Sequence, residues 1–105
     1  MDKIDEAVLQ KFRSLLSRRI HVNQLILFGS RARGDADLGS DMDVLVVVEE
    51  LDREAEEYIS DCAWEAGFDR GIVVVPVVFT RHEWEEGLEH HSLLVQAVEK
   101  EGIPV

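Results

Sequence analysis

The spacing of apolar residues changes twice in the first half of the chain. Over residues 3–19 they recur every three or four positions, which predicts an amphipathic helix with one buried stripe. The stretch "VNQLILFG" (22–29) predicts a short buried strand that ends at Gly29. The turn-rich "SRARGDADLGS" (30–40) predicts a loop with at most one helical turn. "MDVLVVV" (42–48) is apolar and β-branched throughout, which predicts a strand covered on both faces.

The second half repeats this alternation. Residues 52–66 have helical spacing, and Gly67 is placed to end that helix. "GIVVVPVVF" (71–79) predicts a third strand, at a sheet edge or with a bulge because Pro76 lacks an N–H donor. Residues 81–100 return to helical spacing, which Gly87 can divide in two, and "GIPV" (102–105) can add a short strand. The order α-β-β-α-β-α predicts one α/β domain over residues 1–105, a small mixed β-sheet with helices packed on it.

Composition narrows the class of protein. The chain has 105 residues and one cysteine, Cys62, which excludes an internal disulfide and fits a reducing compartment. No stretch approaches the roughly 20 apolar residues that span a bilayer. The N-terminus lacks the basic start and apolar block of a signal peptide, so we expect a cytoplasmic protein without a membrane partner.

The net charge of −11 is unevenly distributed. Residues 1–34 carry seven bases and three acids, whereas residues 35–105 carry four bases and 19 acids. An acidic surface repels a phosphate backbone, which argues against nucleic acid as the main partner. A basic protein, or small ligands bound through metal, fits this charge better.

Two aspartates precede and enter the second predicted strand. Asp41 and Asp43 are two residues apart, so their carboxylates point to the same face of an extended segment. Like charges at this distance resist joint ionisation unless water or a cation surrounds them. Magnesium prefers oxygen ligands, usually one or two carboxylates plus phosphates and waters. The pair therefore predicts a metal site; the alternative is two solvated acids at a strand end.

The turn before this strand has the residues of an anion site. Gly29 permits a sharp bend, and Ser30 offers a hydroxyl and an N–H. If residues 30–33 form a helical turn, its free N–H groups can face a phosphate. Arg31 and Arg33 are the nearby bases, one able to meet a phosphate and the other to stay solvated; Arg33 can instead pair with Asp35 or Asp37. Ser40 can cap or orient the two aspartates.

Two other ligand motifs fit the turn poorly. From Gly29 the spacing G-x-x-x-x-G reaches Gly34, but Asp35 stands where a P-loop needs lysine. A calcium-binding EF-hand loop that began at Asp35 would place Val46 where the bidentate glutamate belongs. Neither motif explains the turn.

The segment "GSRARGDADLGSDMD" (29–43) resembles the G-S-x-A-R-G…S-D-x-D signature of the DNA polymerase β-like nucleotidyltransferases, and the short chain resembles their minimal branch. The resemblance implies the nucleotidyltransferase (polymerase β-like palm) fold. It implies that Gly29 and Ser30 bind a nucleoside triphosphate, that Asp41 and Asp43 bind two Mg²⁺ ions, and that AMP passes from ATP to an acceptor hydroxyl. From their positions beside the turn and the aspartates, Arg33 and Ser40 are further nucleotide-binding candidates.

The sequence departs from this pattern on the third strand. Members of the family usually carry a third carboxylate there, and "GIVVVPVVF" has none. Asp69 precedes this strand and Glu83 follows it, both outside the expected register. Positioning and metal electrostatics supply most of the catalysis of phosphoryl transfer, so this loss need not abolish activity.

The remaining candidate residues favour structural roles. His90 and His91 are adjacent on a predicted helix and point in different directions, and His21 and His82 stand apart, so solvated histidines are expected. Cys62 and Trp84 fall on apolar stripes and are predicted to be core residues. Trp64 falls off its stripe, which leaves a partner-facing position or self-association open.

Two functions follow from these patterns. The first is an adenylylating enzyme whose acceptor is a partner protein, because the chain has no room for a separate acceptor-binding domain. Minimal nucleotidyltransferases pair with small helical HEPN-type toxins, so the resemblance implies an antitoxin in a toxin–antitoxin system. The second is a non-catalytic module that binds nucleotide or masks its partner, which the missing third carboxylate favours.

Overall fold

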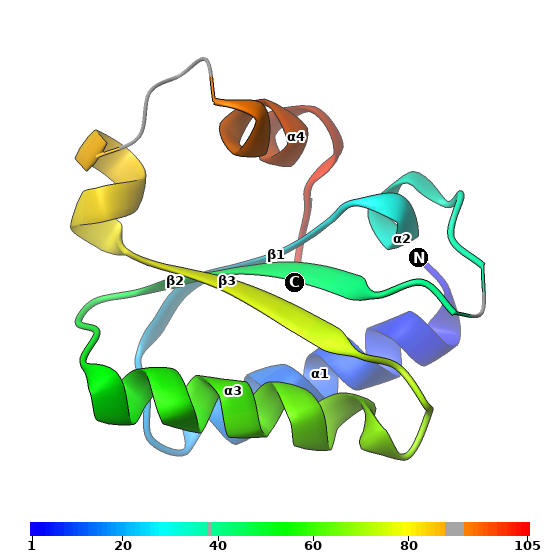
Figure 1. Cartoon of the computed structure of the whole chain (residues 1–105), viewed down its shortest axis with the longest axis horizontal. Helices are drawn as coiled ribbons and strands as arrows, with labels where there is room; N and C mark the ends of the chain where they lie inside the picture. The colour runs from blue at the N-terminus through cyan, green and yellow to red at the C-terminus, as the bar shows by residue number, and fades with distance from the viewer. Residues whose placement is uncertain (38, 88–91) are drawn as a thin grey trace.

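The computed structural model describes residues 1–37, 39–87 and 92–105. Its elements follow the order predicted from the sequence (Figure 1). They are α1 (Lys3–Ser17), β1 (Val22–Phe28), α2 (Ser30–Arg33), β2 (Met42–Val48), α3 (Arg53–Phe68), β3 (Val74–Thr80), the π-helical turn η1 (Glu83–Gly87), α4 (Leu93–Glu101) and β4 (Ile103–Pro104).

Within the described residues, the strands form one sheet in the order β3-β2-β1-β4. β2 pairs antiparallel with β1 and parallel with β3, and β4 pairs antiparallel with β1. The sheet is therefore mixed, as predicted. β3 lies at its edge, which confirms the position inferred from Pro76, since an edge strand tolerates a missing N–H donor.

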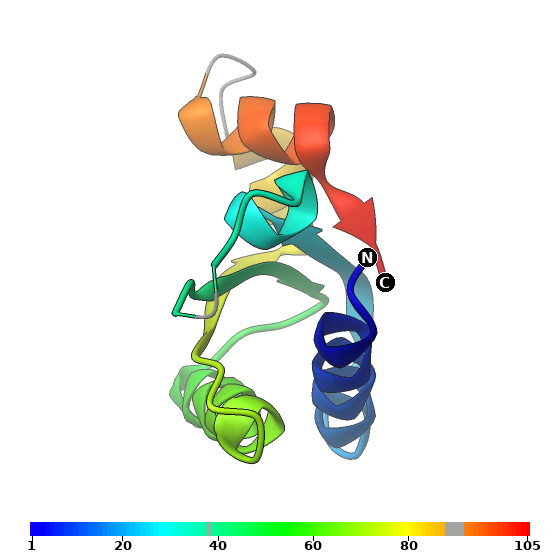
Figure 2. The same cartoon turned by 90° about the vertical axis from the view of Figure 1, so that its right-hand side faces the viewer.

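Helices cover both faces of the sheet (Figure 2). α1 and α3 pack on one face, and α4 lies over the other face beside η1. Alternate residues of β2 serve the two layers: Val44 and Val46 join the larger core under α1 and α3, and Leu45 and Val47 join the smaller core with Val98 of α4. This double burial explains the unbroken apolar run of β2.

The helices confirm the predicted periods but correct two boundaries. α3 continues through Gly67 to Phe68, because Gly67 is buried against the backbone carbonyl of Ile72 and has no room for a side chain. The helix expected over 81–100 comprises η1 and α4, and residues 88–91 between them lie outside the described part of the chain. In the described residues, no helix has the length and apolar character needed to cross a membrane.

Candidate active site

Asp41 and Asp43 flank Met42, the first residue of β2. Asp41 is exposed and Asp43 is half-buried. Asp43 is two residues before Leu45, so its side chain lies on the α4 face of the sheet. Partial burial, and next the charge of Asp41, raise the pKa of Asp43 above its ordinary value. The two carboxylates thus form a like-charge pair at the strand end, and a bound cation would relieve their repulsion.

Gly29 brings the turn after β1 directly against this pair. Phe28 and Asp43 are partners in the β1–β2 ladder, and a Cβ atom at Gly29 would overlap the Asp43 carboxylate. The backbone φ of Gly29 is 79°, a left-handed value that side chains disfavour. Glycine is therefore required here twice, by conformation and by contact.

α2 is the helical turn that the sequence allowed over residues 30–33. The N–H groups of Ala32 and Arg33 donate to the Gly29 carbonyl at 3.1 and 3.0 Å. Ser30 and Arg31 precede them, and the first N–H groups of a helix have no acceptor within the helix. Ser30 is half-buried and directly follows Gly29, the residue in contact with Asp43.

Arg33 is the cation at this turn. Its guanidinium donates to Asp35 Oδ2 at 3.0 Å and to Glu101 Oε2 at 2.9 Å, and its side chain is 47% exposed. The hydrogen bond to Asp35, with further help from Glu101, raises the pKa of Arg33. Its charge in turn lowers the pKa of Asp43, although burial and Asp41 outweigh this effect. The predicted pairing with Asp35 is confirmed, and the Arg33 side chain remains partly exposed to solvent.

Arg31 has a structural role, so the expectation that it meets a phosphate or stays solvated is wrong. It pairs with Asp5 of α1 at 2.7 Å, and the two side chains are only 9% and 6% exposed. Arg31 also donates to the Ser40 carbonyl at 3.0 and 2.8 Å. The Ser40 hydroxyl donates to Asp37 Oδ1 at 3.2 Å and accepts from the Asp37 N–H at 3.1 Å, so this serine shapes the loop before Asp41.

Glu101 is the site residue that the sequence analysis missed. It is the last residue of α4, and its Oε2 accepts a hydrogen bond from the Gly29 N–H at 2.8 Å as well as from Arg33. Its charge contributes to the raised pKa of Asp43. The fold brings this carboxylate to the turn from a distant segment of the chain. No local pattern in the terminal helix marks Glu101, so the sequence analysis could not identify it.

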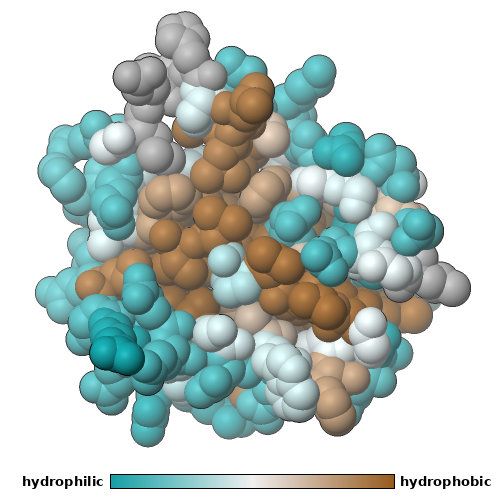
Figure 3. All heavy atoms as spheres, in the orientation of Figure 1, coloured by the Kyte–Doolittle hydropathy of each residue, from teal (hydrophilic) through white to brown (hydrophobic). Residues whose placement is uncertain are grey.

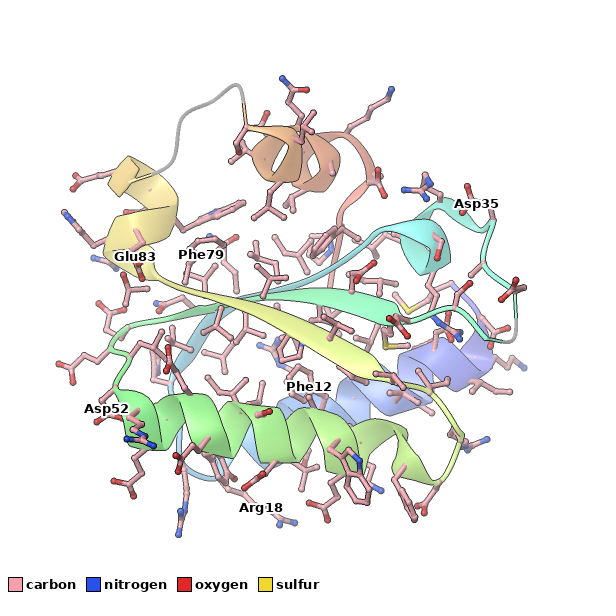
Figure 4. The ribbon with its side chains drawn as sticks, viewed as in Figure 1. Phe12, Arg18, Asp35, Asp52, Phe79 and Glu83 are labelled. Atoms are coloured by element: carbon pink, nitrogen blue, oxygen red, sulfur yellow. The ribbon has the colours of Figure 1, made fainter. Side chains whose placement is uncertain are left out.

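β3 contains no carboxylate, as its sequence requires. The β2–β3 register places Val75 opposite Asp43, and the Val73 carbonyl accepts a hydrogen bond from the Met42 N–H. Asp69 instead pairs with Lys11 at 3.3 Å, and Glu83 accepts from the Thr80 N–H at the opposite end of β3 (Figure 4). Among the described residues, no three His, Cys, Asp or Glu side chains form a metal-binding cluster.

The other singled-out side chains mostly follow their predicted roles. His21 is exposed, and the exposed His82 pairs with Glu86 at 2.8 Å; His90 and His91 lie outside the described residues. Cys62 is buried, and burial raises the pKa of its thiol. Trp84 packs on Phe79 in the smaller core, whereas Trp64 is exposed.

Solved structures of similar fold include toxin–antitoxin complexes. In a crystal structure of a toxin–antitoxin with AMP-PNP, the match covers 90% of this chain and 69% of the matched chain, with a TM-score of 0.64 and 24% identity. In a Shewanella oneidensis complex of a tri-AMPylated HEPN toxin with an MNT antitoxin, the match covers 95% of this chain and 70% of the matched chain, with a TM-score of 0.59 and 20% identity. At these identities the likeness shows the shared nucleotidyltransferase fold.

Sequence comparison gives a further relative and the family. A Methanocaldococcus jannaschii protein, provisionally named a protein adenylyltransferase, is 36% identical over 61 residues, which span 57% of this chain and 62% of that protein. The model of the nucleotidyltransferase domain family matches residues 6–104, a range that includes the Gly29 turn and both aspartates. The chain therefore belongs to the nucleotidyltransferase domain family.

Proposed function

We propose that this chain is a magnesium-dependent enzyme that transfers AMP from ATP to a hydroxyl group of a partner protein. The observation that carries the proposal is the pair of Asp41 and Asp43 at the start of β2, with Asp43 directly against the turn at Gly29. The pKa of Asp43 is raised by burial and then by the charge of Asp41, and a divalent cation would offset both effects. The M. jannaschii relative, named for protein adenylylation, supports the same chemistry.

Each site residue has a role in this proposal. Asp41 and Asp43 would hold two Mg²⁺ ions, which supply charge neutralisation of the triphosphate and a template for in-line displacement. The amide and hydroxyl of Ser30 bind a phosphate at the Gly29 turn, and the exposed part of Arg33 meets phosphate charge. Ser40 contributes through its carbonyl, which fixes Arg31 and thereby α2.

The reaction is a single displacement at the α-phosphorus. The acceptor oxygen forms a bond to the α-phosphorus. At the same time the bond between the α-phosphorus and the oxygen that bridges to the β-phosphate breaks, and pyrophosphate leaves. The acceptor proton passes to solvent, because valines line β3 opposite the aspartates. General-base catalysis contributes about 10²–10⁴-fold in enzymes that have it, so we expect slow turnover.

The proposed partner is a small helical protein of the HEPN type. The S. oneidensis complex joins an AMPylated HEPN toxin to an MNT antitoxin, and this chain shares that antitoxin fold. The 19 acids after residue 34 favour a basic surface on the partner. Under this proposal, the chain acts as an antitoxin that adenylylates the toxin.

The test is transfer of label from α-³²P-ATP with Mg²⁺ to the protein encoded next to this chain. The wild type should label that protein, and Asp41→Asn with Asp43→Asn should abolish labelling without loss of fold. Exposed Glu56→Gln on α3, away from the aspartates and the Gly29 turn, is the control and should label normally. Absence of transfer by the wild type would contradict the proposal.

The second candidate function is masking of the partner without catalysis. The observation that favours it is Val75, which occupies the position opposite Asp43 where a third carboxylate would stand. Masking predicts that the double asparagine variant still neutralises its partner fully. Loss of neutralisation in a variant that still binds the partner would eliminate masking.

A further inference from the structure

We propose that the apolar groove between α3 and β3 is the docking surface for the acceptor protein, and that it takes a segment with an apolar anchor flanked by lysine or arginine. This inference rests on the proposed function and assigns a surface to its partner. The groove has a volume of about 400 Å³. Its main lining residues are Ala63, Trp64, Gly67, Phe68, Val73 and Pro76.

Three large apolar side chains are exposed together at this groove. Trp64, Phe68 and Val73 are 66%, 63% and 62% exposed, and the rings of Trp64 and Phe68 stack at 4.6 Å between centroids. Figure 3 shows hydrophobic side chains gathered in a band across the same face of the molecule. Contiguous apolar surface of this kind marks interaction sites, and tryptophan is enriched among the residues that dominate binding energy.

The groove also borders an open sheet edge. β3 has β2 on one side and no strand on the other within the described residues. Such an edge offers unpaired N–H and C=O groups to an incoming chain, although Pro76 removes one donor. An extended segment can therefore bond to the strand while its apolar side chain enters the groove.

One end of the groove adjoins the two aspartates. The Val73 carbonyl accepts a hydrogen bond from the Met42 N–H at 2.9 Å, and Met42 lies between Asp41 and Asp43. Neighbouring strands are about 4.8 Å apart, so a segment seated at Val73 lies one strand away from the carboxylates. The groove lies on the α3 side of the sheet and the Asp43 carboxylate on the α4 side, so a docked partner reaches the two aspartates around the open edge of β3 at Val73.

The charges around the groove select the occupant. Asp61 and Glu65 lie three residues before Trp64 and Phe68 respectively, which places each acid beside a ring on the surface of α3. Neither acid forms an ion pair with a described residue. A second copy of this chain would bring the same acids and a net charge of −11 to the contact, so a basic partner fits better.

The test uses three synthetic peptides of equal length that contain a tyrosine. The first has two leucines flanked by lysines, the second replaces the lysines with glutamates, and the third replaces the leucines with alanines. Binding is followed by NMR through the two tryptophan indole signals. Trp84, which packs on Phe79 in the smaller core, is the internal reference for an intact fold.

We expect the first peptide to shift the Trp64 indole signal and the other two to bind much more weakly. Trp64→Ser should weaken binding about 30-fold, as for a central anchor of an interface, and Trp64→Phe should retain most of it. Asp61→Lys should weaken binding, and Glu56→Lys, at an exposed position one turn or more away, should not. Leu93→Ser is the matched apolar control, because Leu93 is 84% exposed outside the groove.

Equal binding of the lysine peptide to wild type and Trp64→Ser would overturn the inference, as would a preference for the glutamate peptide. A wild-type dimer that Trp64→Ser dissociates would assign the groove to a second copy instead. A parallel assay of AMP transfer to the peptide tyrosine separates the two proposals. Docking without transfer in any condition contradicts the proposed function alone, and transfer that is insensitive to Trp64→Ser contradicts the docking surface alone.

Discussion

Glu101 and Arg33 are 68 residues apart in sequence and form a 2.9 Å ion pair at the candidate active site. The same carboxylate oxygen accepts the Gly29 N–H, so the end of α4 is fastened to the turn proposed to bind phosphate. Glu101 thus places an anion among the groups that a triphosphate would contact. The carboxylates of Asp43 and Glu101 would repel the triphosphate of a nucleotide. Bound cations must therefore offset these negative charges for the nucleotide to bind tightly.

Glu101→Gln removes this charge and keeps an oxygen that can accept the Gly29 N–H. We expect the variant to bind Mg²⁺-ATP up to about fivefold more tightly, since a partly exposed charge contributes at most about 1 kcal/mol. Isothermal titration measures the difference. Glu99→Gln, an exposed acid on the same helix, should leave the affinity unchanged. Weaker binding by Glu101→Gln would show instead that Glu101 positions Arg33 for the phosphate.

The buried pair of Asp5 and Arg31 is expected to stabilise the position of α2 on α1. Arg31→Met leaves the Asp5 carboxylate, 6% exposed, without its cation. We expect the free energy of unfolding to fall by about 3–5 kcal/mol, the usual loss when one partner of a buried pair is removed. Urea denaturation measures this loss. Arg53→Met, which breaks the exposed pair with Glu57, should change stability by less than about 1 kcal/mol, and a similar loss in both variants would contradict the buried role.

The raised pKa of Asp43 predicts a dependence of stability on pH. Because folding raises this pKa, the protonated carboxyl favours the folded state at acid pH. That contribution is lost as pH rises through the pKa of Asp43 in the folded protein. In the absence of metal, Asp43→Asn should therefore be more stable than wild type at pH 7, and the difference should shrink towards acid pH. Thermal unfolding at several pH values tests this, and a wild type more stable than Asp43→Asn at pH 7 would contradict it.

Val75 offers a way to restore the third carboxylate. It is half-buried on the strand next to Asp43 and in register with it. If the missing general base limits turnover, Val75→Asp should raise the rate of AMP transfer by about 10²-fold or more. Val75→Asn is the matched control, since it has nearly the same shape without the charge. Equal rates in the aspartate and asparagine variants would show that the base is not limiting.

The local pattern of the sequence predicted most elements and part of the site. Period and turn residues suffice for β2 and for the bend at Gly29, because a strand buried on both faces and a left-handed glycine leave a direct trace in the sequence. The spacing of Asp41 and Asp43 likewise predicts a common face for their carboxylates, and their metal-binding role stays a prediction. The match of the family model to residues 6–104 confirms the family that the signature indicated.

The missed features depend on contacts between distant segments. Arg31 pairs with Asp5 across 26 positions, and Glu101 reaches Gly29 across 72. Gly67 resembled a helix end, but α3 passes through it because Ile72 packs against its bare backbone. Hydrophobic periodicity predicts which face of a helix or strand is buried. It does not predict which residues of other elements contact that face.

The central claim is that Asp41 and Asp43 hold divalent cations against a triphosphate at the Gly29 turn. The most direct measurement is an NMR titration of the ¹⁵N-labelled chain with Mn²⁺ and a non-hydrolysable ATP analogue. We expect paramagnetic broadening centred on the amides of Gly29, Ser30 and Asp43, and its loss in Asp41→Asn with Asp43→Asn. Broadening that is centred elsewhere on the acidic surface, or that persists unchanged in the double variant, would contradict the claim.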